Sequence, residues 1–328
     1  MSAANRPPSS FTPRERTFTL PSTKLILAAQ EWGNTTGGTP ILALHGYLDN
    51  SQTWSAFLPI FLAKNPNCHI VALDFAGHGR SGHRSKEAQY GIFEYARDVI
   101  EVVNLLGWSK FALLAHSMSG YVSFTLAAAL PARITHVVSV ECMHPWVVDN
   151  AGAANNVLRA LKFEDAASRR ATPRARKTYP SLAAIAAVRA ASSAAMPLSL
   201  GAAELLMERN TVADPEGVVT AITDMRLKDP SPYIISVPLA KEAWSHITCP
   251  TLVVLATGGN LLAMWPEAGS ASNGIPGLVV KELPGKHHLH LDDDVELVVD
   301  TVLQWFGEHP LLRKREMETS APVVGYKL

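Results

Sequence analysis

The chain has 328 residues, of which 47% are hydrophobic and 18% are charged, a composition that excludes an intrinsically disordered protein. Basic and acidic residues are equal in number, at 29 each, so no excess of charge favours binding to nucleic acid or to an anionic membrane surface. No apolar run reaches the roughly 18 residues that a membrane-spanning helix needs, and we therefore expect no such segment.

Short apolar strands and amphipathic helices alternate through residues 16–144, after a Pro/Ser-rich stretch (1–15) that we expect to be flexible. A hairpin is predicted first, from residues 18–20 and 25–29. The strands that follow are apolar throughout, which is typical of a mostly parallel, doubly wound α/β sheet covered on both faces. The predicted strands are 41–44, 69–73, 111–114 and 135–140, and the predicted helices are 54–63, 92–106 and 120–130.

The pattern changes between residues 145 and 247, where alanine-rich helical segments alternate with proline and glycine. Apolar strands resume at 250–255 and 278–283, and an amphipathic helix follows at 295–306. We therefore predict one α/β core, formed by residues 16–144 and 248–309, with a helical cap (145–247) inserted between two strands of its sheet. Residues 310–328 are expected to form a mobile tail.

The most informative stretch is the end of the strand 111–114, where Ala115-His116-Ser117-Met118-Ser119 leads into a helix. A serine at such a corner sits in a strained turn that exposes its hydroxyl, and the residues two before and two after it must be small. Ala115 and Ser119 meet this requirement, although glycine is usual at both places. The pattern predicts Ser117 as a nucleophile.

A serine hydroxyl needs a base near pH 7, and histidine is the residue suited to that role. His287 follows the last predicted strand, so its loop leaves the same edge of the sheet as the serine corner, and His288 is the alternative base. We expect the remaining strand-end histidines to support the structure or line a pocket: His45, His78 and His116. His287, His288, His290 and Asp292 could also suggest a metal site, but no partner cluster of ligands is visible elsewhere in the sequence, and we predict neither a metal nor a cofactor.

The third residue of a triad is a carboxylate that orients the imidazole. The loop after strand 250–255 contains no acid, whereas Glu141 lies directly at the end of strand 135–140. A carboxylate after an apolar strand is costly to bury unless it is paired, so we predict Glu141 as this residue. Asp149 is the second candidate. Two alternatives remain: Glu141 is simply an exposed residue at the end of a strand, or the site is a Ser-His dyad without an acid.

Two backbone N–H groups are needed to stabilise the oxyanion of an acyl-transfer intermediate. We predict that Met118, at the start of the helix, and Tyr47, after His45-Gly46, supply them. Apolar side chains near these loops could line a pocket for an acyl group or could simply be core residues. Besides Met118, the candidates are Trp54, Met143, Trp146 and Trp265.

Taken together, these features resemble the α/β-hydrolase superfamily over residues 18–308, and the serine hydrolase-like proteins in particular. The resemblance is carried by His45-Gly-Tyr-Leu-Asp-Asn-Ser-Gln-Thr-Trp54, Tyr179-Pro-Ser-Leu182, Asp229-Pro-Ser-Pro-Tyr233 and His287-His-Leu-His-Leu291. It implies an α/β-hydrolase fold with Ser117 as nucleophile and His287 as base. A carboxylate at the position of Glu141 is similar to the arrangement in some haloalkane dehalogenases, but a serine nucleophile argues against dehalogenase and epoxide hydrolase reactions.

The sequence therefore predicts a serine hydrolase that transfers the acyl group of a small or medium apolar ester or thioester to water. The alternatives are a non-catalytic small-molecule-binding protein on the same scaffold, and a C–C bond hydrolase or hydroxynitrile lyase. We predict a small-molecule substrate, with no nucleic acid or membrane partner. Three cysteines without metal-ligand spacing and no secretory signal favour a cytoplasmic protein, and the terminal Tyr326-Lys327-Leu328 only weakly suggests a peroxisomal one.

Overall fold

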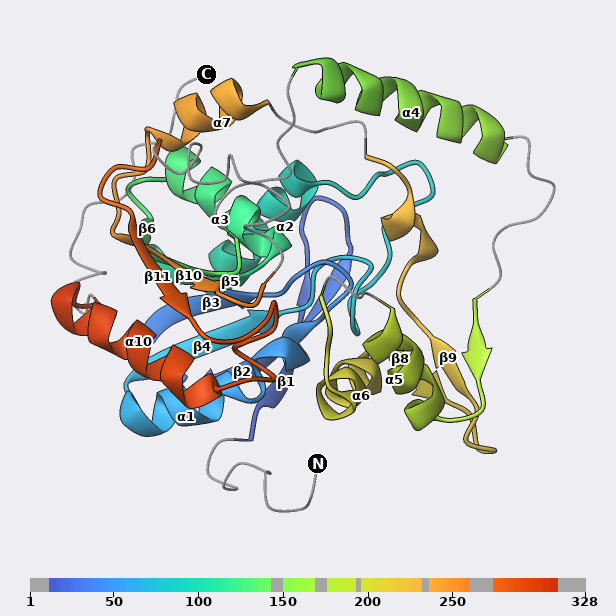
Figure 1. Ribbon diagram of the computed structural model, residues 1–328, viewed down its shortest axis with the longest axis horizontal. Helices are drawn as coiled ribbons and strands as arrows, with labels where there is room; N and C mark the ends of the chain where they lie inside the picture. The colour runs from blue at the N-terminus through green and yellow to red at the C-terminus, as the bar shows by residue number, and fades with distance from the viewer. Residues whose placement is uncertain are drawn as a thin grey trace.

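The computed structural model describes residues 12–142, 150–168, 176–192, 196–231, 236–259 and 274–311. Within these ranges the main sheet has eight strands in the order β1-β2-β4-β3-β5-β6-β10-β11 (Figure 1). It is antiparallel where β2 meets β1 and β4, and parallel at every other pairing. The strands are β1 (Arg14–Thr19), β2 (Ile26–Gly33), β3 (Thr39–Leu44), β4 (Cys68–Leu73), β5 (Phe111–His116), β6 (Ile134–Val140), β10 (Thr251–Ala256) and β11 (Val279–Leu283).

Helices cover both faces of this sheet (Figure 1). On one face α1 (Phe57–Lys64) and α10 (Val295–Glu308) pack together, over a core that includes Phe61 and Trp305. The opposite face carries α2 (Ile92–Leu105) and α3 (Met118–Ala129), which share a second core with the strands. Strands buried on both faces have no exposed side to make polar, which explains their unbroken apolar sequences. The predicted doubly wound, mostly parallel α/β sheet is confirmed.

The chain between β6 and β10, which we call the inserted segment, contains most of the remaining elements. Its helices are α4 (Asn150–Ser168), α5 (Leu182–Ala191), α6 (Leu200–Arg209) and α7 (Val237–Trp244), with a 3-10 turn η4 (Met225–Lys228). The sequence analysis did not predict its small antiparallel sheet, β7-β9-β8. These strands are only two or three residues long, too short to show a periodic pattern: β7 (Thr178–Tyr179), β8 (Thr211–Ala213) and β9 (Val219–Ala221).

Helix α7 lies within the range predicted for the cap, yet it packs against core helix α3. Trp244 is 1% exposed, and its ring contacts Phe124 edge to face, with centroids 5.3 Å apart. The inserted segment therefore contributes a helix to one of the two core layers. The sequence analysis predicted helical segments in this range but neither the position of α7 nor the surface on which it packs.

Helix α6 is bonded to the core by a buried arginine at its C-terminal end. The Nε of Arg209 donates to Asp74, just after β4, at 2.8 Å, and its guanidinium also bonds Glu15 of β1 at 2.7 Å. In addition, the Asn50 amide donates to the carbonyl of Leu206 at 2.8 Å. Removing one partner of a buried ion pair is strongly destabilising, so these contacts hold α6 in place beside the ends of β3 and β4.

Some predicted regions lie outside the described residues, namely positions 1–11, most of the predicted C-terminal tail and parts of the predicted cap. None of the helices in the described ranges has the length and apolar character needed to cross a lipid bilayer.

Candidate active site

The predicted serine corner is present between β5 and α3. Ser117 adopts φ 52° and ψ −122°, a backbone conformation that is strained for a residue with a side chain. Its N–H donates to the carbonyl of Val140 at 2.9 Å, and its carbonyl accepts from the N–H of Gly120 at 2.8 Å. These bonds hold the half-buried Ser117 at the carboxyl edge of the sheet, between the ends of β5 and β6.

The contacts around Ser117 explain why the chain does not need glycine at positions 115 and 119. The Ser119 hydroxyl accepts from the His116 N–H and donates to the Leu44 carbonyl, both at 2.9 Å, so it links the corner to the end of β3. The closest approach of helix to strand falls one residue later: a Cβ at Gly120 would lie 2.4 Å from the Ser139 hydroxyl. Glycine is therefore required at position 120, and a small polar residue is accommodated at 119.

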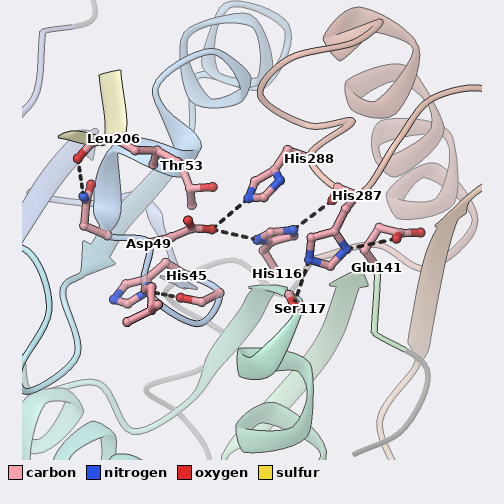
Figure 2. Close-up of polar contacts among 12 residues, drawn as sticks. His45, Asp49, Thr53, His116, Ser117, Glu141, Leu206, His287 and His288 are labelled. Carbon is pink, nitrogen blue, oxygen red and sulfur yellow. Dashed lines mark hydrogen bonds and ion pairs between the residues drawn. The ribbon is translucent and has the colours of Figure 1, made fainter. Parts of the chain in front are cut away.

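His287 lies in the loop between β11 and α10, as predicted, and is 3% exposed. Its Nε2 is 3.0 Å from the Ser117 Oγ, and its Nδ1 is 3.1 Å from the Glu141 Oε2 (Figure 2). Burial disfavours the charged imidazole and lowers the pKa of His287, although the hydrogen bond to Glu141 opposes this effect. A neutral imidazole held between an acid and a hydroxyl is able to accept the hydroxyl proton.

Glu141 follows β6 directly, with φ 55°, and is 1% exposed. While one carboxylate oxygen faces His287, the other accepts the backbone N–H of Ala256, at the end of β10, at 2.5 Å. A Cβ at Gly259 would lie 2.8 Å from the Glu141 Oε2, so the loop after β10 packs closely on this carboxylate. The loop after β10 thus holds Glu141 in position, although the acid itself comes from the end of the neighbouring strand β6.

The two predicted oxyanion donors are the backbone N–H groups of Met118 and Tyr47. Met118 is the first residue of α3, and Tyr47 follows Gly46, whose Cα lies so close to His116 that a Cβ would be 2.9 Å from the His116 Nδ1. Within the described part of the chain, neither the Met118 nor the Tyr47 N–H donates to a protein acceptor. Met118 is thus at the serine corner, and Tyr47 lies in the loop after β3, where its hydroxyl donates to the Leu227 carbonyl at 3.0 Å.

Trp54, one of the predicted pocket residues, lies in the core. It is fully buried, its indole N–H donates to the Leu44 carbonyl at 3.3 Å, and its ring packs against Phe57 and His290. The structure thus favours the alternative reading of Trp54 as a core residue. Three other predicted pocket residues lie outside the described residues: Met143, Trp146 and Trp265. Asp149, the second candidate for the acid, lies outside them as well.

A second polar cluster, which the sequence analysis missed, lies beside the first. His288, the alternative base, instead bonds Asp49 through its Nε2 at 3.0 Å (Figure 2). His116 donates from Nε2 to the His287 carbonyl at 3.0 Å, while its Nδ1 is 3.6 Å from Asp49. Arg189 of α5 bonds the other Asp49 oxygen at 2.9 Å. The expectation that the histidine-rich loop has no partner ligands is therefore wrong, because the fold brings Asp49 and His116 to His288.

The Asp49 cluster had a signal in the sequence. Asp49 is a carboxylate a few residues beyond an apolar strand, and the burial argument that selected Glu141 applies to it as well. Burial alone would raise the pKa of Asp49, but His288 and Arg189 hold it well below its ordinary value. This carboxylate is thus a charged group that joins the inserted segment to the loops on which Ser117 and His287 lie.

Comparison with known proteins agrees with this fold. Residues 39–294 match the family model of the alpha/beta hydrolase fold. A serine hydrolase-like protein of Danio rerio is 27% identical over 295 residues, covering 88% of each chain, and one of Dictyostelium discoideum is 26% identical over 306 residues, covering 88% of this chain and 81% of the relative.

Two solved structures extend the likeness to three dimensions. The crystal structure of a hypothetical protein from Pseudomonas aeruginosa PAO1 is 36% identical, with a TM-score of 0.79, and covers 90% of this chain and 99% of its own. A thioesterase domain from the curacin biosynthetic pathway shares the fold at 21% identity and a TM-score of 0.73, covering 89% of this chain and 99% of its own. The sheet, the strained serine corner and the family match together show that this chain belongs to the alpha/beta hydrolase fold family.

Proposed function

We propose that this protein is a serine hydrolase in which Ser117 is the nucleophile, His287 the general base and Glu141 the residue that orients His287. One observation carries the proposal: an uninterrupted hydrogen-bonded line from the Ser117 hydroxyl through both nitrogens of His287 to the Glu141 carboxylate, with separations of 3.0 and 3.1 Å. Because Glu141 can only accept, the Nδ1 of His287 carries a proton and its Nε2 offers a lone pair to the hydroxyl.

The reaction follows from that tautomer. The Ser117 Oγ attacks the carbonyl carbon of an ester or thioester as its proton passes to the His287 Nε2. The resulting imidazolium is stabilised by Glu141 and returns the proton to the leaving alcohol or thiol as the acyl–enzyme forms. Water then attacks the acyl–enzyme, again with His287 as base, and the carboxylic acid is released. The half-buried Ser117 is the member of this line that an acyl group can reach.

The negative charge on the tetrahedral intermediate needs donors placed before the reaction begins. The Met118 N–H, at the N-terminus of α3, and the Tyr47 N–H are proposed to donate to this oxyanion, and the helix dipole adds to the attraction. Removing one such donor typically costs about 10²–10³-fold in kcat. The described residues leave both N–H groups without a competing protein acceptor, which supports this assignment.

The substrate class is proposed as a small or medium apolar ester or thioester. The half-buried Met118 supplies apolar surface beside Ser117, and the inserted segment is proposed to act as a cap that covers the acyl group. The similarity to serine hydrolase-like proteins and to a thioesterase domain supports hydrolysis of an acyl bond without selecting between oxygen and sulfur leaving groups.

The decisive experiment compares wild-type protein with Ser117→Ala on p-nitrophenyl esters and acyl-thioesters of graded chain length. We expect kcat to fall on the order of 10⁴–10⁶-fold, because the covalent intermediate can no longer form. A fluorophosphonate probe should label the wild-type protein at Ser117, located by mass spectrometry of the labelled peptide, and should not label the variant.

The matched control is Ser123→Ala, six residues further on in α3. The Ser123 hydroxyl is fully buried and has no hydrogen-bond partner among the residues that the structure describes. Its removal therefore tests the loss of a helix serine without changing Ser117. Turnover that survives in Ser117→Ala would rule out this nucleophile. A wild-type protein that neither labels nor turns over any ester or thioester would instead favour a ligand-binding protein on a hydrolase fold.

A further inference from the structure

Three buried side chains outside the proposed catalytic line converge on one point. Asp49, His116 and His288 each place one potential ligand atom within 4.8 Å of those of the other two. All three side chains are at most 3% exposed. They come from three distant parts of the chain: the loop after β3, the end of β5 and the loop before α10 (Figure 2).

Two of the three separations are close to those between the ligands of a tetrahedral transition metal. Ligand atoms about 2.0–2.1 Å from a zinc ion lie about 3.3 Å from one another. The Asp49 Oδ2 is 3.0 Å from the His288 Nε2 and 3.6 Å from the His116 Nδ1. The two imidazole nitrogens are within 4.8 Å of each other, so binding one ion requires the imidazoles to move toward it.

The tautomer of His116 presents a lone pair to this point. The His116 Nε2 is 3.0 Å from the His287 carbonyl, which can only accept, so Nε2 carries the proton. The Nδ1 is then an acceptor facing a carboxylate oxygen, and this buried atom has no hydrogen-bond partner among the described residues. An N–H bonded to a backbone carbonyl is the arrangement that holds a metal-ligating histidine in position.

The other two ligands also direct an atom toward this point. Arg189 bonds the Asp49 Oδ1, which leaves Oδ2 directed at the two imidazoles. Within the described ranges, the buried His288 Nδ1 has no hydrogen-bond partner. Moving the His288 proton from Nε2 to Nδ1 therefore breaks only the bond to Asp49, which a metal would replace. Two imidazoles and one carboxylate form a ligand set suited to zinc and to neighbouring divalent transition metals.

We propose that Asp49, His116 and His288 form a binding site for one divalent transition-metal ion, separate from the proposed Ser117–His287–Glu141 line. The inference goes beyond the proposed hydrolase activity and does not depend on it. A bound ion would join the ends of β3 and β5 to the loop between β11 and α10, and would therefore stabilise the folded protein as any ligand specific to the native state does.

The test is titration of chelator-treated, full-length protein with ZnCl2 and, separately, with CoCl2. We expect one zinc ion per chain by calorimetry, a rise in Tm with zinc, and the visible absorption bands of cobalt in a site of low coordination number. X-ray absorption of the zinc-loaded wild-type protein should show two imidazoles and a carboxylate as zinc ligands.

Asp49→Asn and His288→Gln should each weaken zinc binding by on the order of 100-fold or more. The control is His290→Gln, in the same histidine cluster, because His290 bonds Thr53 at 2.8 Å and is outside the ligand set, so binding should persist. The absence of stoichiometric binding by wild-type protein would overturn the proposal, as would an absorption spectrum with fewer than two imidazoles. Binding that is lost in His287→Gln but retained in His288→Gln would also overturn it. The wild-type spectrum decides the question even if a variant fails to fold.

Discussion

Two adjacent histidines, His287 and His288, have opposite surroundings. His287 has a partner on each nitrogen, an acid on one side and an accessible hydroxyl on the other. His288 bonds an acid through Nε2, but its buried Nδ1 has no partner in the described part of the chain. A second imidazole, that of His116, faces the same carboxylate. Both carboxylates, Glu141 and Asp49, lie just beyond the ends of parallel strands of the same sheet.

The difference shows that residue type alone does not determine the chemistry of such a site. An acid, an imidazole and a hydroxyl in line transfer a proton from one end to the other. An acid between two imidazoles has no hydroxyl at either end, and it concentrates lone pairs at one buried point instead. The first arrangement suits nucleophilic catalysis, and the second suits ligation of a cation.

The largest expected effect separates the two histidines directly. His287→Gln should lower kcat for ester hydrolysis on the order of 10⁴–10⁶-fold, because no base remains to accept the Ser117 proton. The loss of kcat in His288→Gln should be smaller than the loss in His287→Gln by a factor of more than about 100, because His288 bonds Asp49 and not the Ser117 hydroxyl. Steady-state kinetics of both variants, with circular dichroism to verify folding, measures the contrast. Equal losses of kcat in the two variants would contradict the separate roles of His287 and His288.

The next effect distinguishes the two carboxylates. Glu141→Gln should reduce kcat about 10²–10⁴-fold, because an amide neither fixes the His287 tautomer nor stabilises the imidazolium. The KM should change little, because the buried Glu141 carboxylate bonds His287 and the Ala256 N–H, not the Ser117 hydroxyl. A variant as active as the wild type would favour a Ser117–His287 dyad.

Replacing the other carboxylate, Asp49, is expected to have a smaller effect, on the stability of the folded protein. Asp49→Asn should lower the free energy of unfolding by about 1–3 kcal/mol at pH 7, because charge-assisted bonds to His288 and Arg189 are lost. The Asp49 pKa is depressed in the folded state, so its contribution is present above its ordinary value of 3.8 and is lost as the pH falls below that value. Urea unfolding of both proteins at several pH values should show the difference shrinking in acid. A constant difference at all pH values would contradict the ionised state of Asp49.

The smallest effect concerns pH. The His287 pKa is lowered from 6.5, chiefly by burial, and the base acts in its neutral form. The kcat/KM should therefore rise with pH to a plateau, with a midpoint below 6.5. In Glu141→Gln the midpoint should move lower still, because the bond that favours the imidazolium is removed. A midpoint above 6.5 in the wild type would contradict this account of the base.

Much of the fold could be predicted because its signals are local. Apolar runs such as Ile41–Leu44 and the spacing of Ile92–Leu105 reflect burial within a few residues, and the structure places a strand and a helix there. The strained serine corner was also visible, since only small residues fit on either side of Ser117. The short strands β7 and β8 and the packing surface of α7 were not predicted, because they depend on contacts with distant parts of the chain.

The sequence by itself determined the α/β alternation, the serine corner at Ser117 and the order of the loops that could carry a base and an acid. Only the tertiary structure decided which side chains meet: Glu141 reaches His287 across 146 positions, and Asp49 reaches His288 across 239. These contacts depend on the strand order, in which β3, β5, β6, β10 and β11 lie side by side and their carboxyl ends share one edge. That order is set by the packing of two helical layers on the whole sheet, and no local pattern in the chain encodes it.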